Sequence, residues 1–308
     1  TITLGAGSFL SSSNANTTIA TNEEVEIDAG SIADLNIDLS AAAVASLNLS
    51  GVEITDGDAT LATSSVLVLE NSIGVASTAS NFTVTGRGSL DIDDSTDLTD
   101  GNNLTLVGSS FTWNSSGLTV DTGAKQITGT DGNDSISTGL GDDTLIGGDG
   151  NDTLNGNKGA DVIVTNGLAA SSEIMGGKDI DNISINGTSS SASINGNIGI
   201  DVITLSNASH TGSTVFGGQG DDTITNGFGT VSGTVVYSGD KGNDNIAGGV
   251  GAGSLLGGEG NDTLNGGAGA DTILGNAGDD VVRGEAGNDS VDGADGDDNI
   301  DGNAGDDT

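Results

Sequence analysis

Aspartate recurs at one fixed place in a glycine-rich nine-residue pattern, and carboxylates at regular spacing can hold metal ions. The stretch GGEGNDTLNGGAGADTIL (257–274) contains two copies, each with glycine at positions one, two and four, an acid at position six and an aliphatic residue at position eight. Glycine adopts positive φ at little cost, so such a loop can turn tightly and aim its carbonyl oxygens at an ion. Calcium takes about six to eight oxygen ligands, which carbonyls and the position-six carboxylate can supply together.

Copies of this pattern fill most of the sequence from residue 129 onward. They begin at Gly129, Thr138, Gly147 and Gly156, then singly at Gly176, Gly196 and Gly217, and then at every ninth residue from Gly239 to Gly302. Position eight is aliphatic in every complete copy, from Ile136 to Ile300. Such strict periodicity argues against a flexible acidic linker and indicates a repeat array.

The nonapeptide resembles that of the repeats-in-toxin (RTX) family over about residues 129–308. The resemblance implies an all-β fold, a parallel β-roll in which two nonapeptides make one turn, positions one to six form a loop and positions seven to nine a short strand. It also implies Ca²⁺ ions between loops stacked on the same side, held by the position-six acids. The candidate metal ligands are Asp134, Asp143, Asp152, Asp161, Asp181, Asp201, Asp222, Asp244, Asp262, Asp271, Asp280, Asp289, Asp298 and Asp307.

The spacing of the isolated copies predicts a two-sided arrangement. Their starts are separated by about one full turn, so they should lie on one side, opposite longer calcium-free half-turns at 165–175, 185–195, 205–216 and 226–238. These half-turns keep a late aliphatic residue, namely Ile174, Ile194, Val215 and Val235. One row would hold Asp143, Asp161, Asp181, Asp201, Asp222, Asp244, Asp262, Asp280 and Asp298, and the other Asp134, Asp152, Asp271, Asp289 and Asp307.

Gly253 stands where the acid is expected in the copy above the last calcium-free half-turn, which agrees with this arrangement. Gaps between stacked acids then predict about eleven Ca²⁺ ions. Acids at other positions, such as Asp142, Asp221 and Asp279, are interpreted as solvated loop charges.

Residues 1–128 lack the nonapeptide and form a separate predicted domain. Short runs alternate polar and apolar residues, as in 35–39 and 66–70, and this period of two predicts β-strands. A parallel β-solenoid leading into the roll and an antiparallel sandwich both fit; few aromatic residues and scarce hairpin signals favour the solenoid. We interpret the acid-rich stretch 91–101 as a solvated turn, and residues 41–47 as able to form one helical turn.

The composition excludes several classes of partner. The 308 residues carry 45 acidic and 6 basic side chains, a formal net charge of -39, so nucleic acid and anionic membrane surfaces would be repelled. No apolar run approaches the roughly 20 residues of a membrane span. The sequence starts at Thr1 and stops within a repeat, which suggests a processed product or a piece of a longer protein.

Groups for covalent chemistry are scarce. There is no cysteine, and the one histidine, His210, is expected at the surface, so no two-histidine zinc site and no thiol nucleophile exist. We therefore expect a protein without enzymatic activity. Trp113, Phe216 and Tyr237 are expected to pack rather than form a sugar platform.

The leading hypothesis is an extracellular, calcium-dependent structural protein: a surface-layer or filament subunit or an adhesin stalk. The family resemblance implies type I secretion, with folding driven by calcium outside the cell. Calcium and further copies of the chain are the expected partners, with cell-surface polysaccharide as another. The alternatives are the calcium-binding module of a secreted protease, lipase or epimerase, and a carbohydrate-binding adhesin module.

Overall fold

The computed structural model describes the strands between residues 17 and 114 and residues 125–308, apart from 130–132, 169–170, 207–208 and 228–233. The acidic residues 93–101 lie outside the described part. Contacts divide the chain into two units, 1–158 and 159–308. The described residues contain strands, turns and bends, and no helix.

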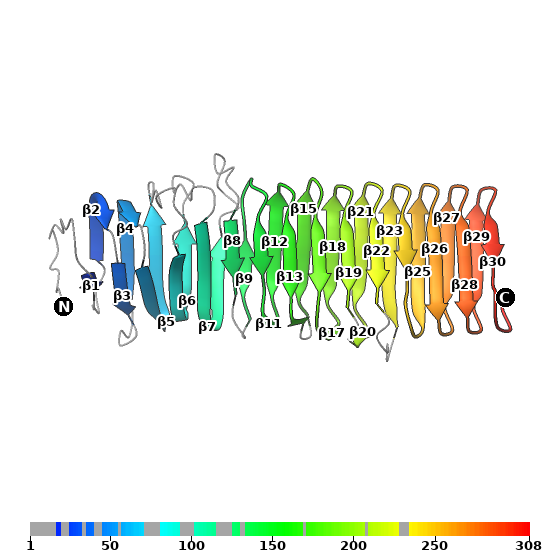
Figure 1. The fold of residues 1–308 in the computed structure, drawn as a ribbon, viewed down its shortest axis with the longest axis horizontal. Helices are drawn as coiled ribbons and strands as arrows, with labels where there is room; N and C mark the ends of the chain where they lie inside the picture. Colours follow the sequence, from blue (N-terminus) through cyan, green and yellow to red (C-terminus); the bar gives the residue numbers. More distant parts are fainter. Residues whose placement is uncertain are drawn as a thin grey trace. The chain divides into compact units, whose positions relative to one another are not determined.

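The first unit is a succession of parallel strands (Figure 1). They are β1 (Thr17–Ile19), β2 (Val25–Ile32), β3 (Leu35–Leu39), β4 (Ala45–Ile54), β5 (Gly57–Glu70), β6 (Asn81–Ile92), β7 (Asn102–Asn114), β8 (Lys125–Thr128), β9 (Ser135–Ser137), β10 (Thr144–Ile146), β11 (Asp149–Gly150) and β12 (Thr153–Lys158). The part of 41–47 that is described, Ala45–Leu47, lies in β4 and is not helical.

Strand pairing in the first unit is that of a coil with two sides. β1 pairs with β3 and β2 with β4, so each strand meets the strand after next. The longer β5 pairs with β3 through Gly57–Leu61 and with β4 through Ser65–Glu70, with a register shift between these parts. Both sides of one turn are therefore formed by a single bent strand. All these pairs are parallel, as in a solenoid.

The second unit repeats a shorter version of the same coil. Its main strands are β13 (Val162–Thr165), β15 (Glu173–Lys178), β16 (Asn182–Ile185), β18 (Ser193–Ile198), β19 (Val202–Leu205), β21 (Thr214–Gln219), β22 (Thr223–Asn226), β23 (Val235–Lys241), β24 (Asn245–Ala247), β25 (Gly253–Glu259), β26 (Thr263–Ala268), β27 (Thr272–Ala277), β28 (Val281–Ala286), β29 (Ser290–Asp295) and β30 (Asn299–Asp301). The short strands β14 (Gly167–Leu168), β17 (Ser189–Ser190) and β20 (His210–Thr211) pair in parallel in a small additional sheet.

The main strands of this unit form two parallel stacks. One stack runs β13, β16, β19, β22, β24, β26, β28, β30, and the other β15, β18, β21, β23, β25, β27, β29. Figure 1 shows the two sets alternating along the unit. This unit is a parallel β-roll, as the resemblance to RTX repeats implied.

The core consists of the position-eight side chains, one per half-turn. Those of the first stack are Ile163, Ile183, Ile203, Ile224, Ile246, Leu264 and Val282, all fully buried. Those of the second are Ile174, Ile194, Val215, Tyr237, Leu255 and Ile273, each at most 1% exposed. Ile300, after which no further turn follows in the structure, is 46% exposed. Burial of each aliphatic side chain contributes about 1.5–3 kcal/mol, so the two internal columns are the main apolar support of the fold.

One predicted core position is corrected by the strand register. Val235 was expected to be the late aliphatic residue of 226–238, but Val215 pairs with Tyr237, which in turn pairs with Leu255. Val235 is also buried, two residues earlier, opposite Gly253. The half-turn is longer than its predecessors, and the extra residues move the core position from the aliphatic to the aromatic side chain.

Candidate metal centre

In the glycine-rich loops, positions two and four take a positive φ. In the copy starting at Gly257, positions two and four are Gly258 and Gly260, with φ of 124° and 128°. An L-residue rarely adopts these angles, so glycine is the residue that lets this loop turn. Asparagine tolerates the left-handed region, and Asn276 takes position two of another copy with φ of 78°.

The glycine at position one leaves space for the acid at position six. A Cβ atom on Gly266 would lie 2.7 Å from Asp271 Oδ2 and 2.9 Å from the carbonyl oxygen of Gly284 in the next turn. On Gly217 it would lie 2.5 Å from Asp222 Oδ2. The carboxylate therefore folds back against the backbone of its own loop, beside a carbonyl oxygen of the neighbouring turn.

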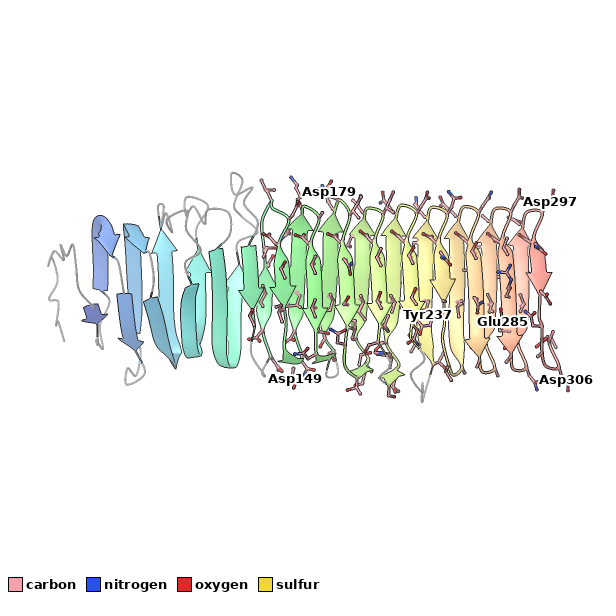
Figure 2. All side chains as sticks on the ribbon, viewed as in Figure 1. Asp149, Asp179, Tyr237, Glu285, Asp297 and Asp306 are labelled. Carbon is pink, nitrogen blue, oxygen red and sulfur yellow. The ribbon has the colours of Figure 1, made fainter. Side chains whose placement is uncertain are left out.

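The position-six aspartates form two ladders in the second unit. In the first row, the backbone N–H of each aspartate donates to Oδ1 of the aspartate one turn later, at 2.7–3.0 Å, from Asp161 through Asp181, Asp201, Asp222, Asp244, Asp262 and Asp280 to Asp298. In the second row, the N–H of Gly253 donates to Asp271, Asp271 to Asp289 and Asp289 to Asp307. Figure 2 places Asp297 and Asp306, which precede the last acids of the two rows, at opposite edges of the unit.

The first unit holds the same arrangement. Asp134, Asp143 and Asp152 are each at most 2% exposed, and the N–H of Asp134 donates to Asp152 Oδ1 at 3.1 Å. The structure therefore stacks the candidate ligands in the order that the spacing predicted within each unit. Asp298 and Asp307 are less buried than the others.

The second carboxylate oxygen of the ladder residues has no donor. Oδ2 is buried without a hydrogen-bond partner in Asp181, Asp201, Asp222, Asp244, Asp262, Asp271, Asp280 and Asp289. A buried ionised oxygen is costly unless it is paired or bound to a metal. A cation beside Oδ2 and the adjacent carbonyl oxygen would satisfy both, and hard oxygen donors of this kind suit calcium. The residues present thus fit a calcium site.

Burial weakens the acidity of these carboxyls. Burial raises the pKa of Asp152, Asp181, Asp222 and Asp262 to about 7 and that of Asp201 and Asp244 to about 6, against backbone hydrogen bonds that lower it; repulsion from neighbouring carboxylates adds to the rise for all but Asp201. Without a bound cation, these carboxyls would therefore hold a proton up to about pH 6 to 7. A bound cation would replace it.

Acids at position five lie outside these ladders. Asp221 and Asp279 are exposed, and Asp221 Oδ1 accepts the backbone N–H of Asn243 at 2.7 Å. Asp279 Oδ1 accepts the N–H of Asp297 at 2.9 Å. These groups form an outer row of hydrogen bonds in contact with water, in agreement with the expectation that they are solvated charges. The described residues hold no cluster of three or more His, Cys, Asp or Glu side chains suited to a metal, so each candidate site depends on carbonyls as well.

The calcium-free half-turns replace both parts of the loop. At position six of the second stack, acids give way to Ser172, Ala192, Ser213 and Val235; at position one, glycine gives way to Thr165, Ile185, Leu205 and Asn226. All eight side chains are buried. The sequence predicted that these half-turns lack the glycine loop, but not that side chains fill the space that the loop occupies in regular copies.

His210 lies in the interior, so the expectation of a surface histidine is wrong. It is fully buried; Nδ1 lies 2.8 Å from Ser189 Oγ, and Nε2 lies 3.0 Å from the carbonyl oxygen of Ser206. Because a carbonyl only accepts, Nε2 carries the proton and Nδ1 accepts from the Ser189 hydroxyl. Ser189 Oγ is also 3.0 Å from Ser213 Oγ. Both ring nitrogens are satisfied, and burial lowers the pKa of His210, so the group is neutral and structural.

A search of family models finds the RTX calcium-binding nonapeptide repeat at 128–163, 213–230, 238–273, 256–291 and 274–308. No curated protein and no solved structure matches the chain. In the described residues no helix is long and apolar enough to cross a membrane. The matched segments include the candidate aspartates of both rows except Asp181 and Asp201, and RTX nonapeptide repeats bind Ca²⁺.

Proposed function

We propose that the chain, which carries RTX repeats on parallel β-strands, is an RTX β-roll protein and an extracellular structural protein whose folding is driven by Ca²⁺. The observation that carries this proposal is the row of buried Oδ2 atoms without a donor in the second unit. Buried carboxylate oxygens without a donor require a positive charge nearby, which a calcium ion would supply.

The free energy of calcium binding is large enough to control folding. One site at a calcium concentration of 100 times its Kd stabilises the fold by about 2.7 kcal/mol. Net stabilities of domains are about 5–15 kcal/mol, so a few sites suffice to decide whether the roll is folded. About eleven ions would bring about 22 positive charges and reduce the formal net charge from -39 to about -17.

The candidate ligands are the fourteen position-six aspartates, together with carbonyl oxygens of the glycine loops. Proteins with RTX repeats are typically secreted, and low calcium inside the cell with higher calcium outside would keep such a chain unfolded until export. A surface-layer or filament subunit or an adhesin stalk, exported by type I secretion, is the proposed setting.

A role without catalysis is supported by the polar groups of the interior. The Ser189–His210 pair is buried and its imidazole is held by a backbone carbonyl, so it lacks both access and an orienting carboxylate. The remaining buried polar groups of the second unit are mainly the aspartate ladders.

The proposal is tested by sedimentation and negative-stain electron microscopy of the chain with chelator and with millimolar calcium. We expect expanded single chains in chelator and compact particles that associate into filaments or sheets in calcium. Compact particles that remain dispersed at every protein concentration would contradict the assembly role and leave calcium-driven folding intact. Compact particles in chelator would contradict calcium-driven folding itself.

A further inference from the structure

In the second unit, the second row of aspartates begins after two neutral side chains, Asn226 and Tyr237. Asn226 is 4% exposed and Tyr237 is fully buried. Asn226 Nδ2 donates to Tyr237 Oη at 2.7 Å and to the carbonyl oxygen of Gly248 at 3.0 Å. The tyrosine hydroxyl points at the same carbonyl oxygen, at 3.4 Å. Figure 2 shows Tyr237 in the body of the roll, away from its loop edges.

This carbonyl has a different environment in the regular copies. There, the position-one carbonyl oxygen lies beside the carboxylate of the preceding turn, as Gly284 O does beside Asp271 Oδ2 near Gly266. A carboxylate and a carbonyl oxygen next to each other repel unless a cation or a proton lies between them. At Gly248 the preceding turn contributes an amide N–H and a hydroxyl, so the carbonyl already has its donors.

The neighbouring positions also lack the acid that a calcium site at Gly248 would require. Val235 occupies position six of this turn and Gly253 that of the next, so neither turn brings an acid to Gly248. The nearest side-chain atom to a Cβ on Gly248 would be Leu255 Cδ1, at 3.2 Å, where regular copies have Oδ2. Tyr237 reaches the carbonyl only because it replaces the shorter aliphatic residues of its core column, Val215 before it and Leu255 after it.

We propose that Asn226 and Tyr237 form a neutral plug that takes the place of a calcium ion at Gly248. The plug lets a calcium-free half-turn stack directly against a calcium-binding one, without leaving the carbonyl of Gly248 unpaired. It therefore determines where the second row of ions begins. This inference rests on calcium binding by the repeats and is independent of the role outside the cell.

The same logic explains the order of residues along the position-one column. Thr165, Ile185 and Leu205 pair in succession and fill the space within the calcium-free stretch. Asn226 follows Leu205 in this column and is the last side chain before the glycines return at Gly248. Ile185 and Leu205 are apolar and lie between two calcium-free half-turns, whereas Asn226 supplies a donor at the boundary.

The test is the number of Ca²⁺ ions bound per folded chain, measured by equilibrium dialysis and metal analysis at saturating calcium. Asn226→Leu copies Leu205 one turn earlier, and Tyr237→Phe removes only the hydroxyl. Both variants are expected to bind as many ions as the unmodified chain and to lose stability equally at low and high calcium. Loss of an ion in either variant would show that its side chain is a ligand and would overturn the plug.

Asn226→Asp tests the same idea in the opposite direction. A carboxylate at this position places an acceptor beside the carbonyl of Gly248 and recreates the oxygen pair of the regular copies. We expect one further bound ion and a folding midpoint that depends more steeply on calcium. An unchanged ion count in Asn226→Asp, at a pH above 8 where the carboxyl is ionised, would show that the donors are not what excludes calcium.

Discussion

Replacing Asp222 with alanine should weaken the roll mainly through calcium. Asp222 Oδ1 accepts the N–H of Asp201 at 2.7 Å, and Oδ2 is buried without a donor. Loss of the first contact leaves a buried N–H unpaired, which costs about 1–3 kcal/mol at any calcium concentration. Asp222 is stacked between two other acids and would serve one or two sites, each contributing about 2.7 kcal/mol at 100 times Kd. The calcium-dependent loss is therefore about 3 to 5 kcal/mol.

The neighbouring Asp221 provides the matched control. Its carboxylate is exposed and accepts only from Asn243, at 2.7 and 3.1 Å, where water can replace it. Asp221→Ala should cost about 0.5–1.5 kcal/mol, independent of calcium. The assay is urea unfolding followed by circular dichroism at several calcium concentrations, with the bound ions counted in parallel. Equal losses in both variants, or a loss in Asp222→Ala that does not grow with calcium, would refute the assignment of position six as the ligand.

Three further predictions concern the pKa of buried groups and the space beside a position-one glycine. Burial raises the pKa of Asp181 and Asp262 to about 7, above the value of about 3.9 in an unfolded chain. Without calcium the folded state therefore binds more protons than the unfolded state, so in chelator the circular dichroism signal of β-structure should grow as the pH falls from 7 to 4. A signal that does not change with pH would contradict this prediction. Burial lowers the pKa of His210, so below about pH 6.5 the unfolded state gains protons first and the free energy of unfolding in calcium should fall. His210→Gln should remove this part of the pH dependence, measured by urea unfolding. An unaltered pH dependence would count against a neutral buried imidazole. Gly239→Ala places a methyl group against the Asp244 carboxylate and 2.6 Å from the carbonyl oxygen of Gly257, so it should raise the calcium concentration at the folding midpoint; an unchanged midpoint would mean that the carboxylate lies elsewhere.

The regular part of the fold was predictable because one local pattern determines it. The resemblance of the nonapeptide to RTX repeats implied the β-roll. The steps between isolated copies predicted the row from Asp161 to Asp298, which the hydrogen bonds from Asp161 to Asp181 and onward reproduce. Strand stacking requires only that equivalent residues lie one turn apart. Gly253, which lacks the acid, still donates to Asp271, so the backbone ladder continues where the charge does not.

The irregular half-turns were less predictable because their partners are distant in sequence. His210 is hydrogen-bonded to Ser189, which lies in the preceding half-turn, 185–195, and carries no recognisable motif. The sequence alone does not determine whether Val235 or Tyr237 takes the core position of the longer half-turn, 226–238. A signal did exist at position one, where Leu205 and Asn226 stand in place of glycine.

Amide hydrogen exchange at the position-six residues tests the calcium claim most directly. The N–H groups of Asp222 and Asp262 are bonded to the ladder in the folded roll, and Asp221 and Asn261 beside them report the same turns. Calcium-driven folding predicts that peptides containing these residues are protected only when calcium is present and exchange at unfolded rates in chelator at neutral pH. Equal protection in chelator and in calcium would contradict it.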